Sequence, residues 1–206
     1  MTLDGLRPMA DRAIAPVVSG AKRAGLTPDA VSVLALVVAI AAGGSFYYAG
    51  EERLFYLLGA FLVWLNGVLD LVDGKLARET GTASPAGDLL DHVLDRYADI
   101  IIVAGLAAGI GEFLLGFVAI TGVLMTSYLG TQAQAVGLDR VYGGLLGRAD
   151  RLVLIAATAV FAAFIESTAL GFGLIGWLLV VFAVVGHLTA LQRFYYARRD
   201  LQGQGM

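Results

Sequence analysis

The sequence predicts an all-α membrane protein with six transmembrane helices and an N-terminal amphipathic interfacial helix. The first observation is composition: of 206 residues, 58% are hydrophobic and 15% are charged, whereas soluble domains average about 45–50% and about 25%. The second is that apolar stretches of about 20 residues recur, long enough as helices to cross a hydrocarbon core of about 30 Å. The third is that basic residues gather on one side of those stretches.

The first 26 residues are expected to form a helix that lies along the inner leaflet. Apolar side chains recur at helical spacing from Leu3 to Val18, and charged side chains such as Arg7 and Asp11 lie between them. This pattern is typical of a helix in the membrane interface. The apolar stretch 31–50 that follows lacks a small-residue cleavage site soon after it, so we interpret it as a membrane helix rather than a signal peptide.

Six spans are expected inside a bundle that covers residues 28–192. Thr27 and Pro28 predict where the first helix begins, because Thr is a good N-cap and proline is favoured in the first turn. Residues 193–206 are expected to form a cytoplasmic tail, with Arg193 at the end of the last helix. Short charged or glycine-rich breaks, including 75–87 and 139–144, separate the spans, which are 31–50, 54–72, 88–110, 113–134, 145–165 and 169–190.

The basic residues predict the orientation. With the N-terminus inside, alternating spans leave Arg53 on the outer side and place the other Lys and Arg residues at the inner ends, as the positive-inside rule requires. Both termini are therefore expected in the cytoplasm, and residues 1–206 form a single domain of a multi-pass cell-membrane protein. The inner residues are Arg7, Arg12, Lys22, Arg23, Lys75, Arg78, Arg96, Arg140, Arg148, Arg151, Arg193, Arg198 and Arg199.

Charge and cysteine content exclude several functions. The 14 basic and 17 acidic residues leave a net charge of −3, which provides no strong positive field to recruit nucleic acid. The chain has no cysteine, so it forms no disulfide framework, no Cys-ligated zinc or iron–sulfur centre and no thiol nucleophile.

Four aspartates stand out near the inner ends of two consecutive spans. Asp70 and Asp73 are three residues apart, and Asp91 and Asp95 are four apart, so each pair lies on one helix face. A carboxylate at the centre of a bilayer costs roughly 2.5–3.5 kcal/mol, so the four are expected to need cations. One interpretation is structural: Lys75, Arg78 and Arg96 neutralise the aspartates in a salt-bridged rim. The other is a metal site, because Mg²⁺ and Mn²⁺ prefer carboxylate oxygens and two such ions could also bind a diphosphate.

The stretch 69–95 contains a specific motif. Its order is Asp70-x2-Asp73-Gly74-x2-Ala77-Arg78-x8-Gly87-x3-Asp91-x3-Asp95, which matches all eight fixed positions of the CDP-alcohol phosphotransferase signature. The chain therefore resembles that family over essentially its whole length. Further likeness to phosphatidylinositol phosphate synthases and their archaeal ether-lipid counterparts lies in LRPMADRAIAPV, RAGLTPDAVSV and GRADRL.

The resemblance implies a reaction and roles for the motif residues. An alcohol hydroxyl attacks the lipid-linked phosphorus of a CDP-lipid, either CDP-diacylglycerol or CDP-archaeol, and CMP is released at the cytoplasmic side. Asp95 is implied as the general base, and two Mg²⁺ or Mn²⁺ ions are implied at Asp70, Asp73, Asp91 and Asp95. The family also implies a homodimer and a nucleotide site at Asp70, Gly74, Ala77, Arg78 and Gly87. Asn66, one turn before Asp70, is assigned to the same site, where it either orients a ligand or hydrogen-bonds across helices.

The acceptor alcohol stays open at the level of sequence. Arg148 and Arg151 share a helix face, and with Arg193 they are expected to converge on the phosphate of an acceptor such as inositol phosphate or glycerol phosphate; anchoring at the inner membrane surface is the structural alternative. Many inositol-phosphate enzymes carry Lys-Ala-Arg after a Ser-Tyr pair, but here Ser127-Tyr128 is followed by residues 129–134, LGTQAQ. An unphosphorylated acceptor such as serine therefore remains an alternative.

Two other classes of membrane protein fit the acidic motif less well. Membrane prenyltransferases also bind a diphosphate through acidic motifs, but they have about nine spans and lack the Gly-x2-Ala-Arg stretch. A divalent-cation transporter would carry acids near mid-membrane on several helices, whereas these acids gather at one end of two. Asp99 continues the acidic face one turn deeper, where it is expected to meet water, Arg96 or another polar side chain.

Overall fold

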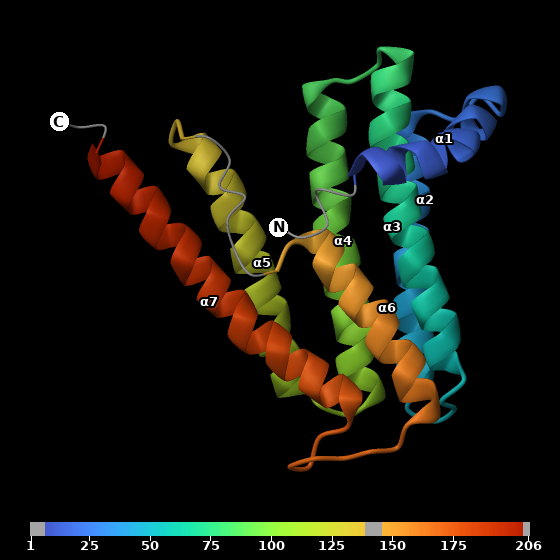
Figure 1. Cartoon of the computed structure of the whole chain (residues 1–206), viewed down its shortest axis with the longest axis vertical. Coiled ribbons are helices and arrows are strands. Elements are labelled where there is room, and N and C mark those ends of the chain that lie inside the picture. The colour runs from blue at the N-terminus through green and yellow to red at the C-terminus, as the bar shows by residue number, and fades with distance from the viewer. Residues whose placement is uncertain (1–6, 139–145, 204–206) are drawn as a thin grey trace.

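A computed structural model describes residues 7–138 and 146–203 of the chain, and all the regular elements in these ranges are helices (Figure 1). The all-α prediction is therefore confirmed for the described residues. The expected break at 139–144, together with Arg140, lies outside them. In chain order the helices are α1 (Arg7–Arg23), α2 (Pro28–Tyr48), α3 (Phe55–Thr80), α4 (Pro85–Gly109), α5 (Phe113–Ala135), α6 (Arg148–Phe164) and α7 (Leu174–Gly203).

Four of these helices, α2, α3, α5 and α7, are long and apolar enough to cross a membrane. The other two helices for which the sequence predicts spans are different in character. α4 carries five charged residues, and α6 has 17 residues, one turn less than a typical span. The chain is thus a membrane protein with several candidate spans.

Side-chain caps determine where two helices of the bundle begin. The Thr27 hydroxyl accepts a 3.2 Å hydrogen bond from the backbone N–H of Ala30, and Pro28 occupies the first turn of α2, which confirms the predicted start. Ser84 caps α4 in the same way, with a 3.1 Å bond from the Gly87 N–H. Both caps satisfy a backbone donor that has no partner within the helix.

Two helices extend further than the sequence analysis predicts. α3 continues past residue 72 to Thr80, because the polar stretch there keeps helical geometry until Gly81, which takes a left-handed conformation at φ 68°. α7 continues past Arg193 to Gly203, so the expectation that Arg193 ends the last helix is wrong. No proline or glycine interrupts residues 187–202, so the helix continues beyond its apolar part.

Helix α2 positions the rest of the bundle, since it packs against both α3 and α4, while α5 packs along α7 and α6 lies against α3. Small residues permit these close approaches. A Cβ added to Gly105 of α4 would lie 2.2 Å from the carbonyl oxygen of Gly43 in α2. Phe46 and Phe182 are among the largest fully buried side chains of the core.

Helix α1 crosses the bundle near the turn between α3 and α4 instead of running parallel to the other helices (Figure 1). Its buried side chains Ile14 and Val18 pack in a small cluster with Val72 and Leu76 of α3. An ion pair of 3.3 Å joins Lys22 to Glu79 at the end of α3. The amphipathic helix is therefore attached directly to the segment that carries the first two motif aspartates.

Candidate active site

Three motif carboxylates meet between α3 and α4. Asp70 comes from α3, and Asp91 and Asp95 come from α4; one oxygen of each can be chosen so that all three lie within 4.8 Å of one another. The spacing of four residues puts Asp91 and Asp95 on one helix face, and α2, which contacts both α3 and α4, holds that face opposite Asp70. We call these three residues the carboxylate triad.

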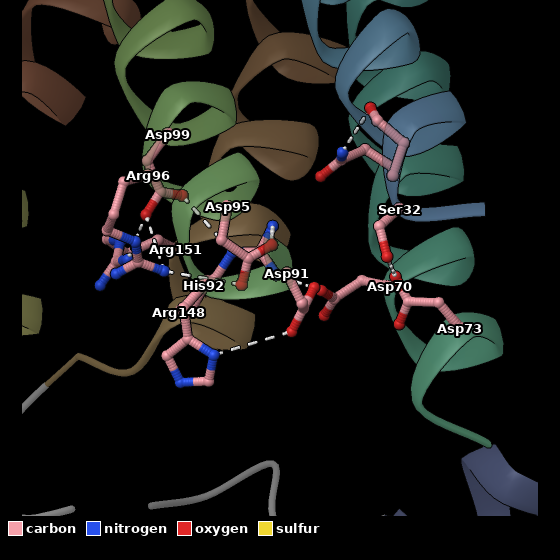
Figure 2. Close-up of polar contacts among 12 residues, drawn as sticks. Ser32, Asp70, Asp73, Asp91, His92, Asp95, Arg96, Asp99, Arg148 and Arg151 are labelled. Atoms are coloured by element: carbon pink, nitrogen blue, oxygen red, sulfur yellow. Dashed lines mark hydrogen bonds and ion pairs between the residues drawn. The ribbon is translucent and has the colours of Figure 1, made fainter. Parts of the chain in front are cut away.

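The fourth motif aspartate, Asp73, lies beside the triad and turns toward α2 (Figure 2). Its Oδ2 accepts a 2.7 Å hydrogen bond from the Ser32 hydroxyl, and only 5% of Asp73 is exposed. Asp73 nevertheless lines the same pocket as Asp70, Asp91 and Asp95. The four predicted metal ligands are thus brought to one place, with three of them gathered in the tight cluster.

Arg148, at the start of α6, reaches across the triad (Figure 2). Its Nη1 lies 2.7 Å from Oδ1 of Asp70, and its Nη2 lies 2.7 Å from Oδ1 of Asp95. The residue that the sequence assigned to the acceptor therefore bridges the acidic faces of two helices in this structure. Charge-assisted contacts of this length are strong.

Behind the triad, Asp99 organises a buried network of arginines. Arg151 donates a 2.9 Å hydrogen bond to its Oδ2, and each of these two side chains is nearly inaccessible to solvent. Arg96 lies 3.6 Å from the same oxygen and donates to the Ser127 hydroxyl of α5. The expectation that Asp99 meets Arg96 or another polar group is confirmed, and the network connects α4 to α5 and α6.

Arg193, the third predicted acceptor residue, is separate from this network. Its Nη1 donates a 2.7 Å hydrogen bond to the carbonyl oxygen of Thr126 in α5. Thr126 and Arg151 line one small pocket between α5, α6 and α7. Arg151 and Arg193 thus approach the same part of the bundle, whereas Arg148 lies at the triad.

Of the residues predicted to bind the nucleotide, Asp70 and Asn66 line the pocket, and the others lie on α3 and in the first turn of α4. Asn66 is buried below Asp70, where its amide donates 2.9 Å to the Ala35 carbonyl and its Oδ1 has no hydrogen-bond partner. Gly74 leaves room beside Arg78, because an added Cβ would lie 3.4 Å from Nη1 of that arginine. The remaining two, Ala77 in the last turns of α3 and Gly87 in the first turn of α4, lie on either side of the turn between these helices.

Sequence reasoning missed Ser32 and Ser127 as partners of site residues. Asp99 was visible in the sequence as the next residue of the Asp91 and Asp95 face, but its arginine partners on α6 were not. Ser32 gave no signal, because a single serine near the start of an apolar helix is common, and only the packing of α2 on α3 brings it to Asp73.

The donor set fits hard divalent cations. All the candidate ligand atoms are carboxylate oxygens, which Mg²⁺ and Mn²⁺ prefer, and the cluster already attracts a cationic group in Arg148. Together the fold and this site define a class: an α-helical membrane protein whose carboxylate cluster could hold a divalent metal ion.

The chain belongs to the CDP-alcohol phosphatidyltransferase family, whose model matches residues 25–185. It is 34% identical over 194 residues to phosphatidylinositol phosphate synthase of Mycobacteroides abscessus, covering 89% of this chain and 82% of the relative. It is 31% identical over 201 residues to archaetidylinositol phosphate synthase of Methanothermobacter thermautotrophicus, covering 97% and 96%.

Solved structures agree with this assignment. Phosphatidylinositol phosphate synthase of Mycobacterium tuberculosis with CDP-DAG bound superposes with a TM-score of 0.77 at 27% identity, over 90% of this chain and 94% of that one. The same enzyme in complex with manganese and citrate gives a TM-score of 0.76, over 88% and 87%. Membership of this family excludes a membrane prenyltransferase and a divalent-cation transporter, and the chain is a CDP-alcohol phosphotransferase of phospholipid biosynthesis.

Proposed function

We propose that this enzyme transfers the phosphatidyl or archaetidyl group of a CDP-lipid to a hydroxyl of inositol phosphate and releases CMP. The observation that carries the proposal is the triad of Asp70, Asp91 and Asp95 inside a complete family signature. The acceptor follows from the relatives, several of which are named phosphatidylinositol phosphate or archaetidylinositol phosphate synthases. Both kinds of relative match similarly well, so both lipid donors are candidates.

The metal ligands are proposed to be Asp70, Asp73, Asp91 and Asp95, with two Mg²⁺ or Mn²⁺ ions bound. A relative crystallised with manganese supports this assignment. When bound, the ions neutralise negative charge on the diphosphate and on the departing CMP.

Asp95 is proposed as the general base. Its side chain lies deeper than Asp91 on the same face of α4 and is 18% exposed, so a small alcohol can approach it from the pocket. Asp95 takes the proton of the acceptor hydroxyl, the alcohol oxygen bonds to the phosphorus that carries the lipid, and the bond from that phosphorus to the CMP oxygen breaks with its electron pair. The proton then passes from Asp95 to solvent.

The nucleotide is proposed to bind along the mouth of the site. Gly74, Ala77 and Gly87 are small, so cytidine and phosphate can come close to the backbone. Arg78 is exposed at the end of α3, where its planar group can donate to phosphate oxygens. The unpartnered Oδ1 of Asn66, one turn below Asp70, offers a buried acceptor at the bottom of the same pocket.

The acceptor phosphate is proposed to bind Arg148, Arg151 and Arg193. The pocket that Arg151 and Thr126 share supports this placement, because Arg193 donates to the Thr126 carbonyl. Gln132 and Gln134 replace cationic residues of many inositol-phosphate enzymes, so fewer charge-assisted contacts hold the phosphate. Glycerol phosphate or serine is therefore the second candidate acceptor.

In the membrane, the chain is proposed to form six spans, α2 to α7, as one domain with both termini in the cytoplasm. Figure 1 supports this arrangement, since α1, the turn from α3 to α4 and the last turns of α7 lie toward the same end of the bundle. The active site then faces the cytoplasm. A homodimer is proposed by family likeness alone.

The deciding experiment measures CMP release by the purified full chain in detergent with Mg²⁺ or Mn²⁺. CDP-diacylglycerol and CDP-archaeol are each offered with inositol phosphate, glycerol phosphate, serine or inositol. We expect inositol phosphate to give the highest kcat/KM and a chelator to abolish release. Turnover that is fastest with serine would overturn the proposed acceptor.

A further inference from the structure

The two terminal nitrogens of the Arg148 guanidinium contact carboxylates on two different helices. Its Nη1 and Nη2 contact Asp70 of α3 and Asp95 of α4, each at 2.7 Å. An arginine that serves one carboxylate usually presents both nitrogens to it. This arginine instead spans the gap between the two acidic faces, whose carboxylates could hold a metal ion.

The third nitrogen of Arg148 is poorly satisfied. Its Nε is buried without a hydrogen-bond partner and lies 3.6 Å from Oδ1 of Asp99. Asp99 is therefore a second anion within reach, on the side away from the triad. The two terminal nitrogens of Arg148 thus make short contacts with the triad, whereas its Nε makes only a long contact with Asp99.

Charge balance explains why the arginine is there. In their ionised forms, the five site carboxylates, the triad with Asp73 and Asp99, outnumber the three guanidinium groups of Arg96, Arg148 and Arg151 by two negative charges. Carboxylates this close repel one another, and the repulsion is strong where water is scarce. The contacts of Arg148 lower that repulsion.

A divalent cation at the triad would change the balance. Asp70 and Asp95, the carboxylates that Arg148 contacts, would help to hold it, and its positive charge would repel the nearby guanidinium. The guanidinium of Arg148 and the divalent cation therefore compete for the same carboxylates, because these carboxylates stabilise either one.

We infer that Arg148 is a displaceable counter-cation of the metal site. It compensates the triad until divalent ions arrive and is then released from Asp70 and Asp95. The last step rests on the proposed function. In that step the released guanidinium becomes available to an anionic acceptor only after metal has bound. Metal occupancy and acceptor affinity are thereby coupled through one side chain.

The test is the affinity for Mn²⁺, measured on the full chain in detergent by electron paramagnetic resonance of the free ion. If Arg148 competes with the metal, Arg148→Gln tightens Mn²⁺ binding by about tenfold or more, because a neutral amide replaces the competing charge. If Arg148 instead orients the ligands, the same change weakens binding by about 10- to 100-fold. Weaker or unchanged binding overturns the inference.

Two variants serve as controls. Arg23→Gln removes the same charge at an exposed position of α1, where the guanidinium bonds to the Ser19 carbonyl, and should leave the Mn²⁺ affinity unchanged. Asp91→Asn alters the triad member that does not pair with Arg148 and should abolish tight binding. Tight binding that survives Asp91→Asn would overturn the proposed metal site, which separates that failure from a failure of the inference.

A second measurement needs no variant and so does not depend on the folding of Arg148→Gln. Phenylglyoxal modifies accessible arginines, and mass spectrometry quantifies each one. Adding Mn²⁺ should raise the modification of Arg148 several-fold relative to Arg151, which stays paired with Asp99. Protection of Arg148 by Mn²⁺, or no change, would contradict its release.

Discussion

The hydroxyl of Ser32 in α2 donates a 2.7 Å hydrogen bond to Oδ2 of Asp73 in α3, and both side chains are buried. This contact fixes the orientation of the one motif aspartate that lies outside the triad. Ligand-orienting hydrogen bonds of this kind commonly matter nearly as much to metal sites as the ligands themselves. The position of Asp73 is therefore set by a neighbouring helix as well as by the signature.

Removing this hydroxyl should affect metal binding. We expect Ser32→Ala to weaken Mn²⁺ affinity by about tenfold, because Asp73 loses the donor that orients it, and Ser32→Thr to restore part of the loss. Ser45→Ala is the matched control, since Ser45 is equally buried in α2 but bonds to the Ala41 carbonyl of its own helix. Equal effects of the two alanine variants would show that Ser32 has no orienting role.

Replacing the proposed base should separate binding from chemistry. Asp95→Asn is expected to lower kcat for CMP release by at least about 100-fold, because the amide cannot take the proton, and to leave CDP-lipid binding largely intact. Asp88→Asn, in the exposed first turn of the same helix, should leave both unchanged. CMP release by Asp95→Asn at the wild-type rate would contradict the assignment.

The buried pair of Arg151 and Asp99 should matter for stability. Arg151→Ala leaves Asp99 without its nearest cation, and breaking a buried pair in this way costs about 3–5 kcal/mol. Arg199→Ala should cost no more than about 1 kcal/mol, because its pair with Asp200 is exposed. Thermal unfolding in detergent provides the measurement.

A double variant distinguishes the pair from a general packing effect. Adding Asp99→Asn to Arg151→Ala should recover part of the lost stability, since no uncompensated charge then remains. Strictly additive losses would contradict an interaction between the two side chains. A rise in acceptor KM alone, with normal stability, would instead favour a direct role for Arg151 in the acceptor site.

Two adjacent glycines in α2 test the helix packing. An added Cβ at Gly43 would lie 2.7 Å from the carbonyl oxygen of Ile101, whereas one at Gly44 meets no atom within 4 Å. Gly43→Ala should therefore destabilise the bundle by about 1–3 kcal/mol. Gly44→Ala should be neutral or stabilise it by up to about 1 kcal/mol, because alanine favours the helix. The reverse order would contradict the packing of α2 on α4.

Local signals in the sequence predicted helix starts better than helix ends. Thr27 and Pro28 mark the start of α2 because capping depends on residues next to one another in the chain. The ends of α3 and α7 were placed too early because hydropathy detects where the membrane-compatible part stops. A polar helix that continues beyond that point has no hydropathy signal.

The sequence by itself determined the all-helical membrane class, the family and the four motif aspartates, because each depends on residue type and spacing along the chain. Tertiary structure alone decided that Ser32 holds Asp73, that Arg151 of α6 pairs with Asp99, and that Arg148 bridges Asp70 and Asp95. These contacts join helices whose relative rotation and depth are set by packing, and small residues such as Gly43 and Gly105 control how closely the helices approach. No local pattern encodes that geometry, so the partners of the aspartates appear only once the bundle is assembled.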